Sequence, residues 1–590
     1  MNRARCCCYP LVVLCVQTCA SAVQDACTSG ELRTDSTPHS LSVEWDLTGD
    51  AAHDATCQVQ YRPQGSDRWL AALPLFRVDY RWWYHTEQAE KALNMFAGSL
   101  MFLEPDTVYE VRLDLSDPDG GTQTKIVTVV TRPLPELPQA GRTLHVVPGS
   151  GGGRGTGEEP FRGLAAAQDA AQPGDILLLH KGDYGTFIFQ KSGEPSKYVV
   201  WKSLGDGDVV FAGIRVNASH LWLEGLRLQR KDEPYGLRTS DRTADVVVQR
   251  CRFDGYHDAI TLKPTSRNWH ITDNVIVGDN DPNLPTNEGG ISGEGVELNH
   301  SSGHVVAYNS ISQVADGISY PERNVDIYGN EIFDVSDDGL EPDYGFANVR
   351  MWGNRITNAK NHALSFQPMK SGPWYFVRNV CVGTGGIFKF RVQDRFVLVN
   401  NTFVRWGSLD HRMHHILSSL SRNNLYISAD GKSPVWVAYD CREPRYCLPN
   451  NYDRTWMTDV DYDGFDWGNS AEAFRWDNHR QRFSDLASFA AAVGIEQHGV
   501  RVRKEEIFEE WQIPTAPSRV APQHLPLKPG CRAVDAGNVL PNLCDDFVGK
   551  APDLGAYELG GQTPQYGPRQ PQDQSSPAAI RQAVGPKPSS

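Results

Sequence analysis

A repeat of short alternating strands runs through the middle of the chain and restricts the folds open to it. Eight segments, from "LWLEGLRL" to "FVLVNNTFV", alternate apolar and polar residues, and most are interrupted by Asn or Gly. The aligned positions are about 21–35 residues apart, a spacing typical of stacked repeats. These positions are Gly225, Cys251, Asn274, Asn309, Asn330, Asn354, Asn379 and Asn401.

No helical pattern fits between these strands, so each repeat is predicted to be all-β. Parallel strands without intervening helices can stack only as a solenoid in which each coil covers the next. The aligned Asn side chains would then hydrogen-bond from coil to coil, as amide ladders do in stacked sheets. We therefore interpret these Asn residues as structural.

This pattern resembles the right-handed parallel β-helix of pectate-lyase-like proteins, from about Leu144 to about Ile427. The resemblance includes an amphipathic helix at about 161–171 that caps the first coil. It implies an all-β fold with a right-handed single-stranded parallel β-helix over 143–430 and an associated C-terminal region over 431–560. The fold alone does not determine a function, because one fold hosts many activities.

A small β-sandwich is predicted over 36–132, ahead of the solenoid. Trp45, the strand end at Tyr61–Pro63 and the string "LEPDTVYEV" around Tyr109 resemble a fibronectin type III domain. In that family the Tyr forms a tyrosine corner. The resemblance implies a spacer or docking module without chemistry of its own.

The two ends of the chain carry distinct signals. Residues 1–22 are typical of a signal peptide, with Arg3 and Arg5, an apolar stretch and "ASA" at the end. No later run reaches the ~18 apolar residues of a membrane span. We expect a secreted protein, extracellular or periplasmic, with no membrane span. Residues 561–590, rich in Pro, Gln and Ser, are predicted to be disordered.

Cleavage after Ala22 would remove five of 13 cysteines and leave eight. An oxidising compartment permits disulfides, and the local pairs Cys441–Cys447 and Cys531–Cys544 are the ones predicted. Loss of two arginines changes the formal charge from −15 to −17. That charge argues against a nucleic acid partner. We expect a monomer.

A second short strand follows a bend in each coil and carries most of the candidate chemistry. Aligned residues on neighbouring coils of a stack lie about 4.8 Å apart. One predicted column contains Asp258, Glu294, Asp316, Asp338, His362 and Gly385. An outward row contains Thr261, Glu297, Ser319, Glu341, Ser365 and Phe388, and a third position contributes Lys263, Asn299, Asp343 and Gln367.

Asp-Gly is a turn signal, so Asp316 and Asp338 could simply bond their own backbone. Turn chemistry does not explain why further acids follow on the strand after the bend. Close carboxyl groups drive their pKa values apart, giving a proton donor beside an ionised base. Glycoside hydrolysis needs such a pair, at about 6.5–9.5 Å for inversion.

The order of the acids is similar to that in the polygalacturonase family of β-helix hydrolases. The matching stretches are "ADG", "DDG", "NHA" and "FKFR". The resemblance implies that Asp337 is the acid, that Asp316 and Asp338 hold the water and that His362 tunes the site. It also implies uronate binding by Lys389 and Arg391. Asn361 and Ala363 replace the family's glycines, and "FKFR" lacks its Arg-x-Lys order.

The predicted function is a secreted carbohydrate-active protein that binds and cleaves a polysaccharide, with uronate as the expected sugar. The predicted catalytic residues are Asp316, Asp337, Asp338 and His362. The predicted substrate-binding residues are Lys263, Glu297, Asn299, Glu341, Asp343, Gln367, Lys389 and Arg391.

Two alternatives stay open. A polysaccharide lyase or epimerase would hold calcium at Glu297, Asp316, Asp338, Glu341 and Asp343, since hard oxygens suit that ion. Its base would be Lys263, Lys389 or Arg391. The other alternative is a non-catalytic glycan-binding or surface β-helix protein. Calcium is the one cofactor that the sequence leaves open.

Overall fold

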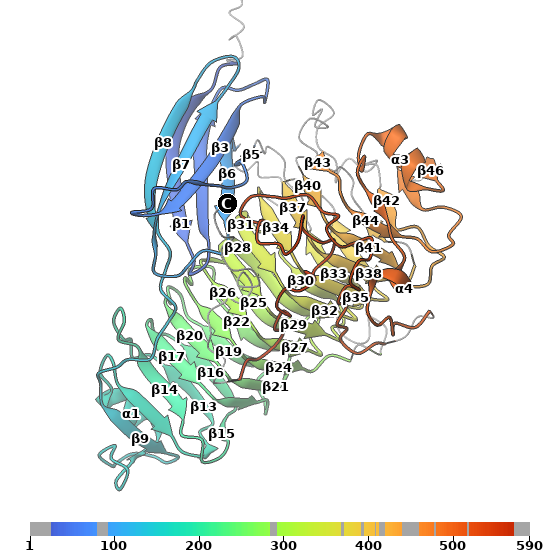
Figure 1. Ribbon diagram of the computed structural model, residues 1–590. Helices are drawn as coiled ribbons and strands as arrows, with labels where there is room; N and C mark the ends of the chain where they lie inside the picture. The colour runs from blue at the N-terminus through green and yellow to red at the C-terminus, as the bar shows by residue number, and fades with distance from the viewer. Residues whose placement is uncertain are drawn as a thin grey trace, which may run out of the picture.

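The computed structural model describes residues 25–78, 93–281, 283, 292–366, 371–390, 395–407, 409–411, 419–438, 459–476, 480–515 and 519–570. The predicted all-β fold is confirmed: a parallel β-helix is preceded by small antiparallel sheets (Figure 1). The predictions for 1–22, Gln367, Arg391, Cys441, Cys447 and 571–590 lie outside the described residues.

Two antiparallel four-stranded sheets form the N-terminal unit. The first has the order β1 (Thr28–Ser36), β2 (Leu41–Thr48), β6 (Met95–Leu100), β5 (Phe76–Val78), and the second β4 (Leu70–Ala71), β3 (Thr56–Pro63), β7 (Val108–Ser116), β8 (Gln123–Val130). Trp45 and Tyr61 are buried in the core between them. The hydroxyl of Tyr109 accepts a hydrogen bond from the backbone N–H of Glu104 at 3.0 Å.

Three parallel ladders of strands make up the β-helix. We call them the site ladder, the rear ladder and the sandwich-side ladder. The site ladder consists of β13 (Thr186–Phe189), β16 (Gly213–Val216), β19 (Tyr235–Thr239), β22 (Asp258–Thr261), β25 (Glu294–Ser302), β28 (Asp316–Tyr328), β30 (Asp338–Glu341), β33 (His362–Phe366), β36 (Gly386–Phe390), β39 (Asp410–His411), β42 (Trp436–Ala438) and β45 (Phe474–Trp476).

The rear ladder is a 13-stranded parallel sheet. It consists of β12 (Gly182–Asp183), β15 (Val209–Phe211), β18 (Arg227–Gln229), β21 (Arg252–Tyr256), β24 (Val275–Gly278), β27 (Ser310–Ser312), β29 (Glu331–Phe333), β32 (Arg355–Thr357), β35 (Val380–Gly383), β38 (Thr402–Arg405), β41 (Leu425–Ser428), β44 (Gly464–Asp466) and β47 (Val500–Arg501).

The sandwich-side ladder shares the long strand β28 with the site ladder. It consists of β9 (Thr143–Val147), β11 (Ile176–Leu179), β14 (Val199–Ser203), β17 (Leu221–Glu224), β20 (Val246–Gln249), β23 (His270–Thr272), β26 (Val305–Ala307), β28, β31 (Ala347–Trp352), β34 (Trp374–Val377), β37 (Phe396–Val399), β40 (Leu420–Arg422) and β43 (Asp459–Val460). Strands past residue 430 show that the coils continue beyond the predicted boundary.

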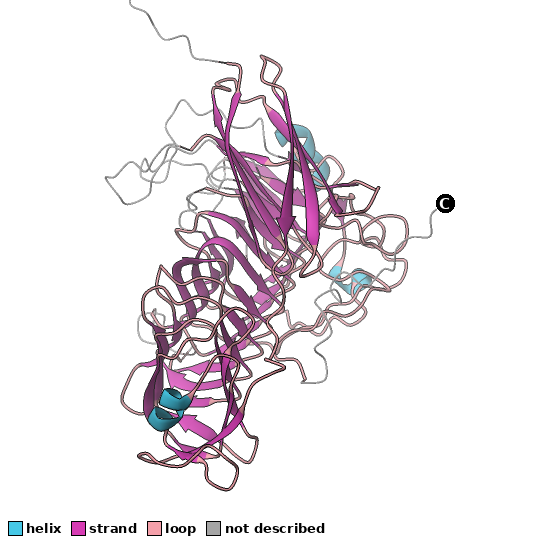
Figure 2. Ribbon diagram, turned by 90° about the vertical axis from the view of Figure 1, so that its left-hand side faces the viewer, coloured by secondary structure: helices cyan, strands magenta, loops and turns pink. Residues whose placement is uncertain are grey.

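Helices are few and lie at the periphery (Figure 2). Among the described residues they are α1 (Leu164–Ala170), α3 (Leu486–Val493) and the single turn α4 (Lys504–Ile507), and the strands there also include β10 (Phe161–Arg162) and β46 (Gln481–Phe483). The predicted capping helix is therefore present as α1, which lies at the first coil and buries Leu164 and Ala167. At the other end, Phe489 of α3 stacks on Phe474 of β45 with ring centroids 4.5 Å apart. Covered ends protect the sheet edges from pairing with another chain.

The predicted Asn ladder is present inside the helix. Its members are fully buried, and each side-chain oxygen accepts from the amide of the previous coil. The ladder runs from Asn274 to Asn401 and continues through Asn424 to Asp463. Buried apolar side chains fill the rest of the coil interior.

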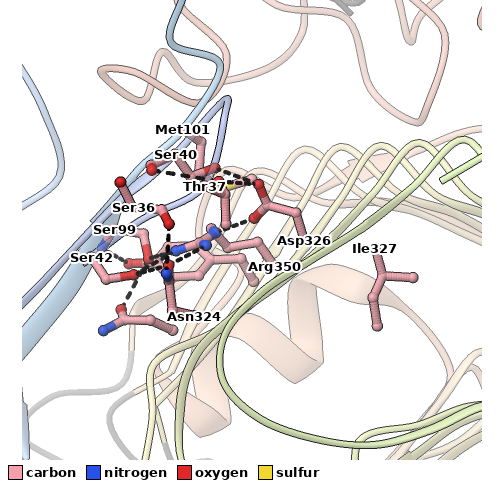
Figure 3. Close-up of polar contacts among 12 residues, drawn as sticks. Ser36, Thr37, Ser40, Ser42, Ser99, Met101, Asn324, Asp326, Ile327 and Arg350 are labelled. Atoms are coloured by element: carbon pink, nitrogen blue, oxygen red, sulfur yellow. Dashed lines mark hydrogen bonds and ion pairs between the residues drawn. The ribbon is translucent and has the colours of Figure 1, made fainter. Parts of the chain in front are cut away.

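The N-terminal sandwich packs on the sandwich-side ladder through a buried polar network (Figure 3). Arg350 on β31 forms an ion pair with Asp326 on β28, and both side chains are fully buried. Its guanidinium also donates to the hydroxyls of Ser42 at 2.8 Å and Ser99 at 3.1 Å, both in the sandwich. Thr37 donates to the second oxygen of Asp326. The sandwich is therefore fixed to the middle of the β-helix by charged groups as well as apolar ones.

The C-terminal segment folds back along the rear ladder. Its backbone carbonyls accept from Trp406 at Pro514 and from Asn358 at Val520. Residues 561–570, which the sequence assigned to a disordered tail, lie against the helix, since Arg569 forms hydrogen bonds to the buried carboxylate of Asp273. Composition missed this contact because isolated residues hold the segment: Tyr566 packs on an apolar cluster and Arg569 pairs with Asp273.

The predicted Cys531–Cys544 disulfide is wrong, because both cysteines are free thiols. Cys544 is buried in a cluster beside the sandwich, where its sulfur accepts from the backbone N–H of Leu540. Cys531 packs on a different cluster over the rear ladder. Proximity in the sequence was therefore a poor guide to proximity in space.

Candidate active site

The predicted column of acids lies on the site ladder. Glu294 pairs with Asp316, and Asp338 pairs with His362, on adjacent strands. The backbone N–H of Asp338 donates to the carboxylate of Asp316 at 2.8 Å, which joins the two pairs. At the lower end of the column, the N–H of Glu294 donates to the Asp258 carboxylate at 3.1 Å.

The register of the last coil differs from the predicted one by a residue. His362 pairs with Gly386 rather than Gly385, and Ser365 pairs with Lys389 rather than Phe388. A Cβ at Gly386 would lie 2.2 Å from the imidazole of His362, so glycine is required there. The shift places the Lys389 side chain in the outward row with Glu341 and Ser365, where the acids can reach it.

Asp338 holds the two basic groups of the site. Lys389 Nζ donates to its Oδ2 at 2.8 Å, and His362 Nδ1 lies 3.3 Å from its Oδ1. Burial alone would raise the pKa of Asp338, but contact with His362 and the charge of Lys389 bring it below its ordinary value. Asp338 is therefore ionised at neutral pH although its side chain is fully buried.

Three other carboxyl groups have the opposite shift. Burial, reinforced by Glu297 and Asp258, raises the pKa of Glu294 to about 8. Burial and Glu294 raise the pKa of Asp316 well above its ordinary value, and burial and Asp343 do the same for Glu341. Among the described residues, an oxygen of Glu294 and one of Glu341 are buried and have no hydrogen-bond partner. These acids need protons or a cation.

The spacing of the acids reflects the coil repeat. The nearest oxygens of Asp316, Asp337 and Asp338 lie within 4.8 Å of one another, as do those of Glu294, Asp316 and Glu341. This is closer than the ~6.5–9.5 Å expected for an inverting pair, because aligned groups on adjacent coils approach at about 4.8 Å. Asp316 and Asp338 therefore behave as one proton-sharing unit rather than as opposed acid and base.

Asp337 is the most accessible of the three acids Asp316, Asp337 and Asp338. It is half-buried and accepts a hydrogen bond from the Asn361 side chain at 2.6 Å. Burial and the charge of Asp338 raise its pKa. A reachable carboxyl group with a raised pKa, next to an ionised one, is suited to proton donation.

The remaining predicted residues surround this centre. Asp343 is buried and accepts from Ser365 at 2.9 Å, while Glu297 is half-buried with a pKa raised by burial. Asn299 donates its amide to the backbone carbonyl of Leu262, and Lys263 is exposed. Lys263 and Asn299 thus lie toward the N-terminal coils, apart from the group around Asp338.

Sequence reasoning left several site residues out. Glu294 lies in the aligned column of acids, so the alignment could have identified it, but it was not among the predicted catalytic or substrate-binding residues. Ser319 lies between Glu297 and Glu341 in the outward row, and its hydroxyl is buried without a partner. Tyr320 follows it, with a pKa that burial and Glu341 raise. Nothing in the sequence singles out the two hydroxyl residues, because Ser and Tyr at these positions fit an ordinary strand.

The predicted calcium set is only partly brought together. Glu294, Asp316 and Glu341 form one group of oxygen donors, and Glu297 and Asp343 belong to neither group that the structure gathers among the described residues. Two oxygens bound to one Ca²⁺ at about 2.4 Å are at most about 4.8 Å apart, so Glu294, Asp316 and Glu341 fit that ion, as do Asp316, Asp337 and Asp338. Hard carboxylate oxygens also match its preference.

Comparison with known proteins finds no matching family model, no similar curated protein and no similar solved structure. In the described part of the chain, no helix combines the length and apolar character that crossing a bilayer would require.

Proposed function

We propose that this chain is a secreted carbohydrate-active enzyme that binds a polysaccharide along the site ladder and hydrolyses it there. The observation that carries the proposal is the half-buried Asp337, whose pKa burial and Asp338 raise, beside the ionised Asp338. A parallel β-helix is compatible with such an activity, because its regular coils offer an extended face to a polymer.

In this mechanism Asp337 donates its proton to the glycosidic oxygen as the bond to the anomeric carbon breaks. A water held by Asp316 and Asp338 attacks that carbon, and its proton passes to the Asp338 carboxylate. The nearest oxygens of this acid and base lie within 4.8 Å, which is closer than the ~6.5–9.5 Å usual for an inverting pair. Lys389 and His362 keep Asp338 ionised through the contacts at 2.8 and 3.3 Å, so they position charge rather than touch the sugar. Uronate binding by Arg391 stays part of the proposal from the sequence resemblance.

The N-terminal sandwich is proposed to be fibronectin type III-like. Its two antiparallel sheets, the buried Trp45 and the hydrogen bond to the hydroxyl of Tyr109 support that assignment. Since it is fixed to the β-helix by Arg350 and Asp326, we infer a scaffolding role rather than that of a mobile spacer.

Asp337→Asn tests the proposal on a panel of polysaccharides, with reducing ends as the readout. We expect the loss of at least about 100-fold in kcat/KM, since general acid catalysis contributes roughly 10²–10⁴-fold. Asp208→Asn, on an exposed carboxylate paired with Arg227, is the matched control and should cleave normally. Normal cleavage by the Asp337→Asn variant would show that Asp337 is not the proton donor.

A calcium-dependent lyase is the second candidate, favoured by the fit of Glu294, Asp316 and Glu341 to that ion. The protonation of Lys389 argues against its being the base of a lyase. Burial would lower the pKa of this amine, but the neighbouring Asp338 raises it and keeps the amine protonated. An unsaturated product that absorbs ultraviolet light, lost on adding a chelator, would establish the lyase. New reducing ends without that absorbance establish the hydrolase, and neither product favours a glycan-binding protein.

A further inference from the structure

A pocket with a cationic lining opens on the same ladder as the acids. It has a volume of about 330 Å³ and is lined by Arg215, Arg238, Thr239, Ser240, Asp241, Thr261 and Lys263. We call it the cationic pocket. Of these residues, only Thr261 and Lys263 were predicted from the sequence to lie on the site face.

The register ties the cationic pocket directly to the acid row. Arg215 pairs with Arg238, Arg238 with Thr261, and Thr261 with Glu297 on successive strands β16, β19, β22 and β25. The coil of Arg238 is three strands from that of Asp316, which is about 14 Å at about 4.8 Å per strand. A polymer lying along the ladder would therefore meet both regions.

The charges of the cationic pocket are not neutralised within the chain. Three basic residues and one acid line it, a balance of +3 − 1 = +2. Arg215 and Lys263 form no ion pair with any residue that the structure describes, and Arg238 has only a 3.7 Å contact with the exposed Glu233. On a chain with a formal charge of −15, this local surplus is distinctive.

Two further features suit a sugar ligand. The guanidinium of Arg238 lies over the ring of Tyr235, 4.0 Å from its centroid, which orients the group. The hydroxyl of Thr261 is buried in the pocket lining, beside the Glu297 carboxylate. The volume is near the lower end of the ~300–1,000 Å³ range of ligand pockets, so it suits one charged group on a compact unit.

We propose that the cationic pocket binds the carboxylate or sulfate of a sugar three coils from the acids, so that the substrate is an anionic polysaccharide. This inference rests on the proposed function. It follows from the order of charges along the ladder: cations at Arg238 and Lys263, acids in the middle, and Lys389 beyond them. Because Asp338 is paired with Lys389, the unneutralised positive charge along the ladder lies at Arg238 and Lys263, where an anionic group is attracted.

The test measures binding of short oligosaccharides by calorimetry, in the full chain carrying Asp337→Asn so that no cleavage occurs. The probes are uronate oligomers, sulfated oligomers and neutral oligomers of equal length. Arg238→Gln and Lys263→Gln remove one charge each from the cationic pocket. Arg154→Gln removes one charge from a side chain that is 80% exposed and paired only with Glu159, and serves as the matched control.

We expect anionic oligomers to bind at least tenfold more tightly than neutral ones, and each pocket variant to weaken that binding at least tenfold while the control leaves it unchanged. Preference for uronate or sulfated probes identifies which acid group binds. Unchanged affinity in both pocket variants, or equal affinity for neutral probes, would overturn the inference. If the chain instead cleaves neutral glycans and this cleavage depends on Asp337, the proposed function would still hold. If no probe binds, both the proposed function and the inference about the cationic pocket would be contradicted.

Discussion

At Asp338, burial and two basic neighbours act on one carboxyl group in opposite directions. Lys389 and His362 determine the outcome, because a cation at 2.8 Å and a ring nitrogen at 3.3 Å stabilise the charged form where no water can. Asp316, Glu294 and Glu341 lack such a partner and have raised pKa values. Chemically identical groups on neighbouring strands are thus brought to different protonation states.

The raised pKa of Asp337 and the lowered pKa of Asp338 predict a bell-shaped pH dependence of kcat/KM, measured with a substrate that the polysaccharide panel identifies. Asp337 must be protonated, so activity falls as the pH rises through its raised pKa. Asp338 must be ionised, so activity falls only when the pH drops below its lowered pKa. Lys389→Met should move the acid limb to higher pH, because the loss of the cation raises the pKa of Asp338. An acid limb that does not move would show that Asp338 is not the base.

At the scale of elements, the Asn ladder supplies the regularity that aligns the acids. Each buried amide accepts two hydrogen bonds from the coil before it and donates to the coil after it. The ladder ends at Asp463, whose pKa burial raises to about 6, beside Glu496 with a pKa raised further by burial and Asp463. The buried carboxyl groups of Asp463 and Glu496 thus lie at the end of the Asn ladder.

Asn330→Ala should destabilise the β-helix by at least about 2 kcal/mol, since each buried group left without a partner costs about 1–3 kcal/mol. The loss would leave the amide of Asn309 and the carbonyl of Val306 unpaired. Denaturant unfolding measures the change. Asn217→Ala, at an exposed position, is the control and should be near neutral. Equal stability of the two variants would contradict a stabilising ladder.

The repeat was predictable from the sequence because its signal is the recurrence of strands and Asn at regular intervals. The column from Asp258 to His362 followed from the same alignment, and the structure agrees with it. Lys389 was misplaced by one residue, because the steric need for Gly386 under His362 exists only in three dimensions. The cationic pocket was missed since its arginines lie on coils where no acid marks the alignment.

Across the whole molecule, the sandwich is joined to the coils that carry the acids by hydrogen bonds from Arg350 to Ser42 and Ser99 and from Thr37 to Asp326. Asp326 lies on β28, the strand that also carries Asp316. The sequence predicted the two units but not the contact between them. The residues that join them, such as Ser42 with Arg350 and Thr37 with Asp326, are about 300 residues apart and have no distinctive sequence signal. The orientation of the sandwich is thus coupled to the strand at the centre of the site.

Arg350→Met should cost roughly 3–5 kcal/mol of unfolding free energy, because it leaves a buried carboxylate without its cation. Arg252→Met, in a pair whose arginine is 47% exposed, is the matched control and should change stability by less than about 1 kcal/mol. Denaturant unfolding at neutral pH compares the two. Indistinguishable midpoints would mean that the interface contributes nothing to stability.

The most direct test of shared protonation among acids from successive coils is a carboxyl titration by NMR in chelator-treated protein. Glu294 should titrate near pH 8, far above the ordinary value of 4.5, while Asp338 stays ionised below the ordinary range for aspartate. The raised group also binds protons more tightly in the folded state, so the free energy of unfolding should fall as the pH rises from 4.5 to about 8. If both carboxyl groups titrated near their ordinary values, the acids would be independent surface charges and the account of the site would be wrong.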